Sequence, residues 1–287
     1  MLTIQVVLER AVKHLEKQGI PRAKRQAEDL LSFVLCMSRM DLCMEFQRPL
    51  EKKELDRCRE ALKRRSKGEP LQYIQGKTDF YGCRIYLSPD VLIPRQETEI
   101  LVDKIAEDLS KENSLKRRSL WDVCCGSGCI GIALKKKFPE LDVVLSDLSE
   151  EALEVAKKNA QKNSVEVTFL QGDLLNPFLE KRTDYFVCNP PYISKGDYFS
   201  LEREVREFEP KQALVGGESG LEFYENLAKS LDGYLNPGGK VWFEIGSCQG
   251  EAVSKMFASE FWKSSRIEED WGGHQRFFFL EKQGLFM

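Results

Sequence analysis

The segment Asn189-Pro190-Pro191-Tyr192 follows the apolar run TDYFVC and carries residue types that could recognise an amino group. Proline lacks a backbone N–H and fixes φ, so the two prolines end a strand and leave a carbonyl that no neighbouring strand claims. The Asn189 side chain adds a second acceptor, and Tyr192 adds an aromatic surface. These groups suit a planar NH2 group, such as a carboxamide or the exocyclic amine of adenine.

A conjugated NH2 group is a weak nucleophile because its lone pair is delocalised. Attack on a methyl donor must be helped by acceptors that hold both hydrogens and align the lone pair with the electrophile. A general base is not required if the proton leaves after attack. The alternative interpretation of the NPPY segment is a turn that only terminates a strand.

The stretch DVCCGSGCIGIAL, residues 122–134, predicts a second binding element. Gly126 and Gly128 allow a tight turn and close approach of a ligand to the backbone, while the following helix offers free N–H groups. Gly131 completes a G-x-G-x-x-G pattern, and Asp147 lies about twenty residues on, as in dinucleotide-binding proteins. An NAD-type oxidoreductase is therefore an alternative, and a purely structural strand-to-helix turn is another.

Polar groups follow the next two predicted strands as well. Ligands of open α/β sheets lie across the carboxyl ends of successive strands, and this chain offers Asp147, Asp173 and Asn189 there. Asp147 could accept from a ribose diol, or it could cap the helix that follows. Residues 172–175, GDLL, could give an adenine ring a polar edge and an apolar cover.

The elements that position these groups form two regions. Apolar residues recur with helical spacing through residues 1–75, which predicts a small helical domain whose charges form a solvated surface or a docking face. Short extended runs broken by glycine and proline predict a hairpin linker over residues 76–95. Beyond it, extended and helical runs alternate, which is typical of a doubly wound α/β sheet over residues 96–287. The predicted helices include 129–138, 149–162, 220–235 and 249–262, and the predicted strands are SLWDVC, DVVLSD, EVTFLQGD, TDYFVCNPP, KVWFEIG and RFFFLEK.

Composition excludes several classes of function. The net charge of −3 provides no global positive field for duplex nucleic acid. The nine cysteines lack zinc-site spacing, only two histidines exist, and we expect reduced thiols in the core and no metal. No run of 18 apolar residues occurs, which indicates a soluble, cytoplasmic protein.

Four longer stretches together resemble one family, the release factor glutamine methyltransferases (PrmC/HemK), within the class I S-adenosylmethionine-dependent methyltransferases. They are GEPLQYIQGKTDFYG, VLIPRQETEILVD, NPPYIS and EVREFEPKQALVGGESGLEFY, and the likeness extends through nearly the whole chain. NPPY alone is shared with adenine methyltransferases, whereas the combination is specific. Cys124 departs from the family pattern, in which a glycine is usual, and we expect adjusted affinity with binding retained.

The resemblance implies a Rossmann-like, seven-stranded methyltransferase domain, joined by a β-hairpin linker to an N-terminal all-helical substrate-recognition domain. It also implies methylation of N5 of the glutamine in the GGQ motif of class I peptide chain release factors. S-adenosyl-L-methionine would be the donor and S-adenosyl-L-homocysteine the product. The implied enzyme is a cytoplasmic monomer that modulates translation termination and binds neither DNA nor membrane.

The same resemblance implies roles for individual residues. Asn189, Pro190 and Tyr192 would be catalytic, and together with Pro191 they would receive the glutamine amide. The donor would be held by Cys124, Cys125, Gly126, Ser127, Gly128, Asp147, Asp173, Leu174 and Asn189.

Three alternative functions account for fewer of these sequence features. An adenine-N6 methyltransferase would share the clamp but should carry a basic groove or a target-recognition insert. A dehydrogenase leaves NPPY without a role, and a non-catalytic cofactor-binding adaptor needs no amino-group clamp.

Overall fold

The computed structural model describes residues 1–284, so the last three positions of the expected 96–287 domain lie outside the described residues. The chain divides into two compact units. The smaller unit contains Met1–Lys77 together with Glu202–Phe208. The larger unit contains Thr78–Leu201 and the chain from Glu209 onward.

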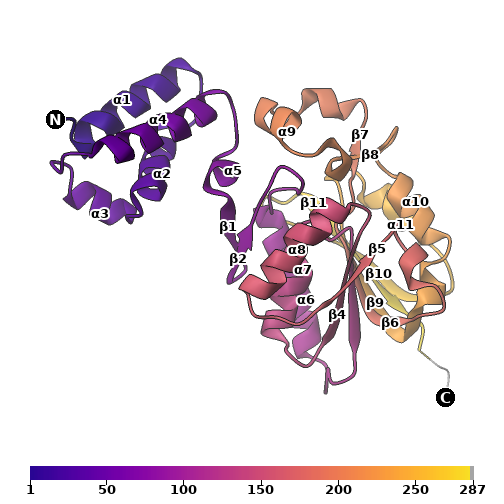
Figure 1. The fold of residues 1–287 in the computed structure, drawn as a ribbon. Coiled ribbons are helices and arrows are strands. Elements are labelled where there is room, and N and C mark those ends of the chain that lie inside the picture. The colour runs from indigo at the N-terminus through magenta and orange to yellow at the C-terminus, as the bar shows by residue number, and fades with distance from the viewer. Residues whose placement is uncertain (285–287) are drawn as a thin grey trace. The chain divides into compact units, whose positions relative to one another are not determined.

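The smaller unit is built from helices (Figure 1), and buried apolar residues of these helices form one core. Ile4, Leu8, Ala11 and Leu15 are buried along one face of the first helix, which begins after the Thr3 cap. The helices with residues in this core are α1 (Ile4–Lys17), α2 (Ala23–Leu35), α3 (Arg39–Met44), α4 (Lys52–Ser66) and α5 (Leu71–Gln75). The short helix α9 (Arg203–Phe208) belongs to the same unit but buries none of its residues.

Arg65 of α4 is a buried cation of this unit, with 2% of its surface exposed. Its guanidinium donates to the Glu69 carbonyl at 2.9 Å, to the Glu204 carboxylate at 2.7 Å and to Gln26. A buried charge needs such partners because desolvation penalises it otherwise. The pair with Glu204 therefore ties the short α9 segment to α4.

The larger unit is a seven-stranded mixed sheet, which confirms the expected α/β class. Its order is β10-β11-β9-β6-β3-β4-β5, and the strand β11 pairs antiparallel with both of its neighbours. In sheet order the strands are β10 (Trp262–Glu269), β11 (Gln275–Lys282), β9 (Leu235–Glu244), β6 (Thr183–Cys188), β3 (Ser119–Val123), β4 (Asp142–Asp147) and β5 (Thr168–Gln171).

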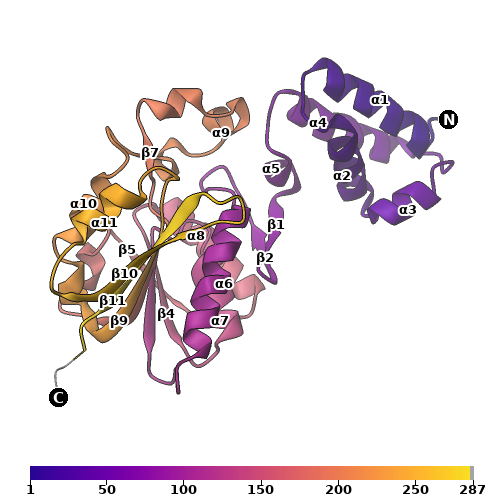
Figure 2. The same ribbon diagram turned by 180° about the vertical axis from the view of Figure 1, so that it is seen from behind.

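Helices cover both faces of this sheet. Figures 1 and 2 show α6 (Gln96–Ser110), α7 (Cys129–Lys137) and α8 (Glu150–Lys162) on one face. The opposite face carries α10 (Glu222–Ala228) and α11 (Gly250–Met256). Every residue of β6 is buried, as expected for a strand covered on both sides. The expected hairpin is formed by β1 (Lys77–Phe80) and β2 (Cys83–Tyr86), which turn at Gly82 with φ +74°.

Further short elements lie between the strands and helices. The strand β7 (Ile193–Ser194) follows the NPPY segment and pairs with β8 (Val215–Gly217). The short 3-10 helices are η1 (Asn176–Phe178), η2 (Asp197–Ser200), η3 (Lys211–Ala213) and η4 (Leu231–Tyr234).

Two predicted helices are wrong in their second halves. The helix predicted over 220–235 ends as α10 at Ala228, and residues from Leu235 already belong to β9, which runs through the turn-like NPGG sequence. The helix predicted over 249–262 ends at Met256, and β10 then begins at Trp262. This strand was missed because it is an edge strand with a mostly exposed, charged sequence, so it lacks an apolar alternation.

The expectation that all the cysteines are core residues is also partly wrong. Five thiols are buried, whereas Cys36, Cys43 and Cys248 are exposed and Cys124 is half-buried.

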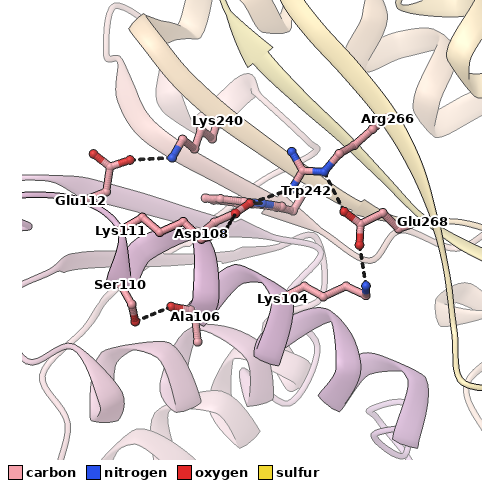
Figure 3. Close-up of polar contacts among 10 residues, drawn as sticks. All are labelled: Lys104, Ala106, Asp108, Ser110, Lys111, Glu112, Lys240, Trp242, Arg266 and Glu268. Carbon is pink, nitrogen blue, oxygen red and sulfur yellow. Dashed lines mark hydrogen bonds and ion pairs between the residues drawn. The ribbon is translucent and has the colours of Figure 1, made fainter.

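Polar contacts join the end of α6 to the strands beside it (Figure 3). The Asp108 carboxylate accepts from the Trp242 indole N–H of β9 at 3.3 Å and from Arg266 of β10 at 2.9 Å. Lys104 pairs with Glu268, and Lys240 pairs with Glu112. The Arg266 and Lys111 partners hold the pKa of Asp108 below its usual range, although burial opposes this shift. None of these residues lines the cavity described below.

No helix within residues 1–284 is both long enough and apolar enough to cross a bilayer.

Candidate active site

A cavity of about 320 Å³ opens at the carboxyl ends of four neighbouring parallel strands. Its wall includes residues that follow β3, end β4, follow β5 and follow β6. This is where open α/β sheets bind their ligands. Of the predicted site residues, those that line it are Cys124, Cys125, Gly126, Ser127, Asp147, Asp173, Leu174, Asn189 and Pro191.

Three predicted residues do not line the cavity: Gly128, Pro190 and Tyr192. A Cβ atom at Gly128 would lie 3.0–3.1 Å from side chains of Ile132, Ala156 and Leu145, so this glycine packs α7 against the sheet. Gly126 has open space at the same point and a φ of +52°, so it leaves the loop accessible.

Cys124 stands at a backbone position with φ +57°. This left-handed region costs an L-residue with a Cβ atom roughly 1–2 kcal/mol, and glycine avoids the cost. The geometry gives a physical reason why glycine is usual at this position in the family that the sequence resembles. Cys124 is half-buried and lines the cavity.

Asp147 connects the end of β4 to the glycine loop. One carboxylate oxygen accepts from the Gly126 N–H at 2.8 Å, and the other accepts from the Ser149 N–H at 3.0 Å. Burial raises the pKa of Asp147, while these backbone donors oppose the shift. The cap of α8 is Ser149, whose hydroxyl accepts from the Ala152 N–H at 3.1 Å. Asp147 is therefore not the cap residue, and its remaining lone pairs can accept from a ligand.

The segment after β5 supplies a mixed wall. Asp173 gives a polar group and Leu174 an apolar one, and both line the cavity. Leu174 also has a positive φ, +47°, within the turn that leads to η1. The Gly172 N–H donates to the Asp147 carbonyl at 3.0 Å, which fixes this turn beside β4.

The NPPY segment leaves β6 directly after the buried Cys188. Asn189 and Pro191 line the cavity, Pro190 is buried, and the Tyr192 hydroxyl lies 3.3 Å from the carboxylate of Glu244. Burial raises the pKa of Tyr192. The ring of Tyr192 thus packs toward the sheet, where it supports the segment from behind.

Backbone atoms of Gly216 and Gly220 pack closely against the NPPY segment. A Cβ atom at Gly216 would lie 2.2 Å from the Pro191 carbonyl oxygen, and one at Gly220 would lie 2.4 Å from that of Tyr192. The Gln249 amide donates to the Tyr192 carbonyl at 2.9 Å. Gly216 and Gly220 of the ALVGGESG stretch are therefore required by close packing against NPPY.

Two polar residues near Asn189 were missed from the sequence: Thr98, which itself lines the cavity, and Glu244, which does not. Thr98, in the first turn of α6, is 2% exposed, and Glu244, the last residue of β9, is 1% exposed. The Thr98 hydroxyl lies 2.7 Å from a Glu244 carboxylate oxygen and 3.5 Å from the Asn189 side-chain nitrogen. The only available signal was a carboxylate at the end of the apolar run KVWF, because nothing in the sequence brings α6 and β9 together.

Asp122, in β3, was also missed from the sequence. It is buried behind the glycine loop, where one oxygen accepts from the Gly131 N–H at 2.8 Å and the other has no partner among the described residues. Burial raises the pKa of Asp122 to about 7. Gly131 is needed here because a Cβ atom would lie 2.3 Å from Leu145.

The wall of the cavity fits a nucleoside-containing methyl donor. Asp147 offers acceptors for hydroxyl groups, Leu174 offers apolar cover, and the loop at Gly126 has room for close approach. Asn189 and Pro191 lie in the same cavity, so an acceptor held there would share the space with the donor.

Solved structures with the same architecture define the class. A methyltransferase from Pyrococcus furiosus superposes with a TM-score of 0.53 at 20% identity, over 71% of this chain and 90% of that protein. The catalytic domain of hMettl16 superposes with a TM-score of 0.55 at 15% identity, over 81% of each chain. With the sheet order and the site at its carboxyl edge, the fold is that of the class I methyltransferases.

Sequence relatives narrow the class to a family. Residues 7–76 match the PrmC N-terminal domain, and residues 96–205 match the methyltransferase small domain. A release factor glutamine methyltransferase of Chlamydia trachomatis is 43% identical over 96% of this chain and 93% of its own length. One from Geobacter sulfurreducens is 40% identical over 89% of this chain and 88% of its own length. The chain belongs to the release factor glutamine methyltransferase family, which confirms the resemblance seen in the sequence and sets the oxidoreductase alternative aside.

Proposed function

We propose that this protein methylates N5 of the glutamine side chain in the GGQ motif of class I peptide chain release factors, with S-adenosylmethionine as donor. One observation carries the proposal. Asn189 and Pro191 line the same cavity as Asp147 and the loop at Gly126, so an amide acceptor and a nucleoside donor have adjoining places. Family members at 35–43% identity over most of the chain carry the name release factor glutamine methyltransferase.

On the donor side, S-adenosylmethionine supplies an electrophilic methyl group on a sulfonium. The chain would hold it through the loop 124–128, with Asp147 accepting from the ribose hydroxyls. Asp173 would offer a polar group and Leu174 an apolar surface to the adenine. The Gly126 N–H already binds Asp147, so the loop and the carboxylate are ordered with respect to each other.

On the acceptor side, the proposed role of the protein is to orient the glutamine amide. The Asn189 side-chain oxygen and the Pro190 carbonyl would accept the two hydrogens of the glutamine amide, and Pro191 would form the adjoining wall. Tyr192 would stiffen the segment through its hydroxyl contact with Glu244. Holding the planar NH2 group aligns its lone pair with the methyl group and excludes water, so no separate base is needed.

The proposed partner is the release factor protein. We propose that the chain acts as a monomer in the cytoplasm, and the net charge of −3 disfavours duplex DNA as a substrate. The helical domain, residues 1–75, would contribute to recognition of the release factor, the hairpin 76–95 would be the linker, and residues 96–287 would be the methyltransferase domain.

The test combines methyl transfer with mapping of the modified residue. The purified protein is incubated with labelled S-adenosylmethionine and a release factor, and peptide mass analysis locates the label beside a control factor with a replaced GGQ glutamine. We expect label on that glutamine only. Label on DNA, or on the control factor to the same extent, would overturn the proposal.

Asn189→Ala tests the amide clamp within the same assay. Loss of one hydrogen bond to the reacting amide should lower turnover roughly tenfold or more, while the dissociation constant of the donor changes little. Asn226→Ala, at an exposed position on α10, is the matched control and should keep wild-type turnover. Turnover of Asn189→Ala within about threefold of wild type would remove Asn189 from the clamp.

A further inference from the structure

We propose that Glu244 and Thr98 are positioning residues, which set the orientation of the Asn189 carboxamide so that its oxygen faces the acceptor nitrogen. The proposal rests on the function proposed above and adds two residues that act through Asn189. Neither is part of the NPPY segment: Thr98 belongs to α6 and Glu244 to β9.

The first step is a chain of three polar side chains. The Thr98 hydroxyl lies 2.7 Å from a Glu244 oxygen, and the Asn189 nitrogen lies 3.5 Å from the Thr98 oxygen. The β6 and β9 strands are parallel neighbours with Cys188 opposite Phe243, so the next residues, Asn189 and Glu244, leave the sheet at the same level. The register of the sheet thus brings the carboxylate behind the clamp.

The second step is the direction of the hydrogen bonds. Burial raises the pKa of Glu244, whereas the Thr98 hydroxyl, the Arg276 cation and the Tyr192 hydroxyl favour its charged form. In that charged form the carboxylate can only accept, so the single proton of the Thr98 hydroxyl is donated to Glu244. The Thr98 oxygen is then left with lone pairs alone and accepts from the NH2 end of Asn189. The oxygen end of Asn189 is thereby turned the other way, and Asn189 lines the cavity. A flipped amide would place two oxygens together with no proton between them.

The third step separates this role from general-base catalysis. Glu244 does not line the cavity, and its two oxygens already face the hydroxyls of Thr98 and Tyr192. The one carboxylate therefore holds both ends of the NPPY segment, Asn189 through Thr98 and Tyr192 directly. A carboxylate that is 1% exposed and committed to two hydroxyl donors has no path to a substrate proton.

The kinetic test uses Glu244→Gln and Thr98→Ala in methyl transfer to the release factor. Glu244→Gln can donate to Thr98 and so permits the flipped Asn189, and Thr98→Ala removes the link. Both should lower kcat roughly tenfold or more with little change in donor affinity. Thr98→Ser should restore most of the turnover lost in Thr98→Ala. Glu251→Gln, at an exposed position on α11, is the matched control.

A double-variant comparison distinguishes positioning from a loss of packing. If Glu244 acts through Asn189, then Glu244→Gln combined with Asn189→Ala should be no slower than Asn189→Ala alone. Multiplied losses would contradict the proposal, as would wild-type kcat in either single variant. If either result were found while the wild-type protein methylated the release factor, the inference would be wrong and the proposed function would still hold.

An NMR measurement tests the inference without relying on turnover, for the case that the proposed function is wrong. The side-chain NH2 signals of Asn189 can be assigned in the NMR spectrum by their loss in Asn189→Ala. They should shift in Thr98→Ala and in Glu244→Gln and return toward their wild-type positions in Thr98→Ser. Unchanged signals in Thr98→Ala would overturn the inference even if the wild type methylated no release factor.

Discussion

Asp147 combines a structural and a binding task in one side chain. Its oxygens accept from Gly126 and Ser149, and the residue lines the cavity. Burial raises the pKa of Asp147, and the backbone donors oppose this rise. The donors thereby favour the charged form, which accepts hydrogen bonds from the hydroxyl groups of a ligand.

We expect Asp147→Ala to weaken S-adenosylmethionine binding by roughly ten- to a hundredfold, because about 1–3 kcal/mol is typical for one lost hydrogen bond that leaves its partner unpaired. Calorimetric titration measures the dissociation constant. Asp142→Ala, at the exposed opposite end of the same strand, is the control and should bind as the wild type does. An unchanged constant in Asp147→Ala would exclude this residue from the donor site.

At the scale of elements, α6 contributes at both of its ends. Its first turn carries Thr98 behind the clamp, and its last turn carries Asp108, which binds the Trp242 indole and Arg266 (Figure 3). The indole is 1% exposed, so its N–H depends on this partner, whereas Lys111 is an exposed partner of the same carboxylate. Asp108 therefore anchors the helix that delivers Thr98.

Asp108→Ala should lower the free energy of unfolding by about 1–3 kcal/mol, because it leaves a buried donor without an acceptor. Urea unfolding followed by tryptophan fluorescence and circular dichroism measures the change. Asp108→Asn keeps an acceptor and should lose less. Lys111→Ala removes only an exposed ion pair and should change stability by less than about 1 kcal/mol. Equal losses in Asp108→Ala and Lys111→Ala would contradict the assigned role of the indole contact.

At the scale of the whole molecule, each of the two units has buried apolar residues of its own. In the smaller unit they include Leu15, Ala27 and Leu30, and in the sheet unit they include Phe186, Phe243 and Phe278. All four tryptophans, Trp121, Trp242, Trp262 and Trp271, belong to the larger unit. Tryptophan fluorescence therefore reports on the sheet unit, while circular dichroism reports on both.

Leu15→Ala should destabilise the smaller unit by about 2–5 kcal/mol, as is usual for a fully buried leucine. If the two units unfold separately, part of the helical dichroism should be lost at lower urea concentration, and the fluorescence midpoint should stay at its wild-type value. Leu179→Ala, at an exposed leucine of the larger unit, is the control and should move neither signal. A common shift of both signals would show that the two units unfold as one.

The cavity residues at the strand ends could be predicted from the sequence, because chemistry at strand ends depends on local order, whereas the lining residues between 89 and 98 and between 210 and 223 could not. Gly126, Asp147, Asp173 and Asn189 each follow an apolar run, and parallel strands bring their carboxyl ends to one edge. The local pattern could not predict β10, because this edge strand is mostly charged and lacks apolar alternation. It also could not predict the early end of α10. In β9 the turn-like sequence was overridden by pairing with β6 and β11, and in β10 the polar sequence was overridden by pairing with the adjacent strand β11.

Sequence alone determined the α/β class, the order of motifs and the family, since periodicity and motif spacing are properties of the chain itself. Only the tertiary structure decided that Gly128 serves packing, that Tyr192 faces Glu244, and that Thr98 lies behind Asn189. Thr98 and Asn189 are separated by 91 positions, and Tyr192 and Glu244 by 52. Contacts over such separations arise from the register of the sheet and the packing of α6, which no local pattern encodes.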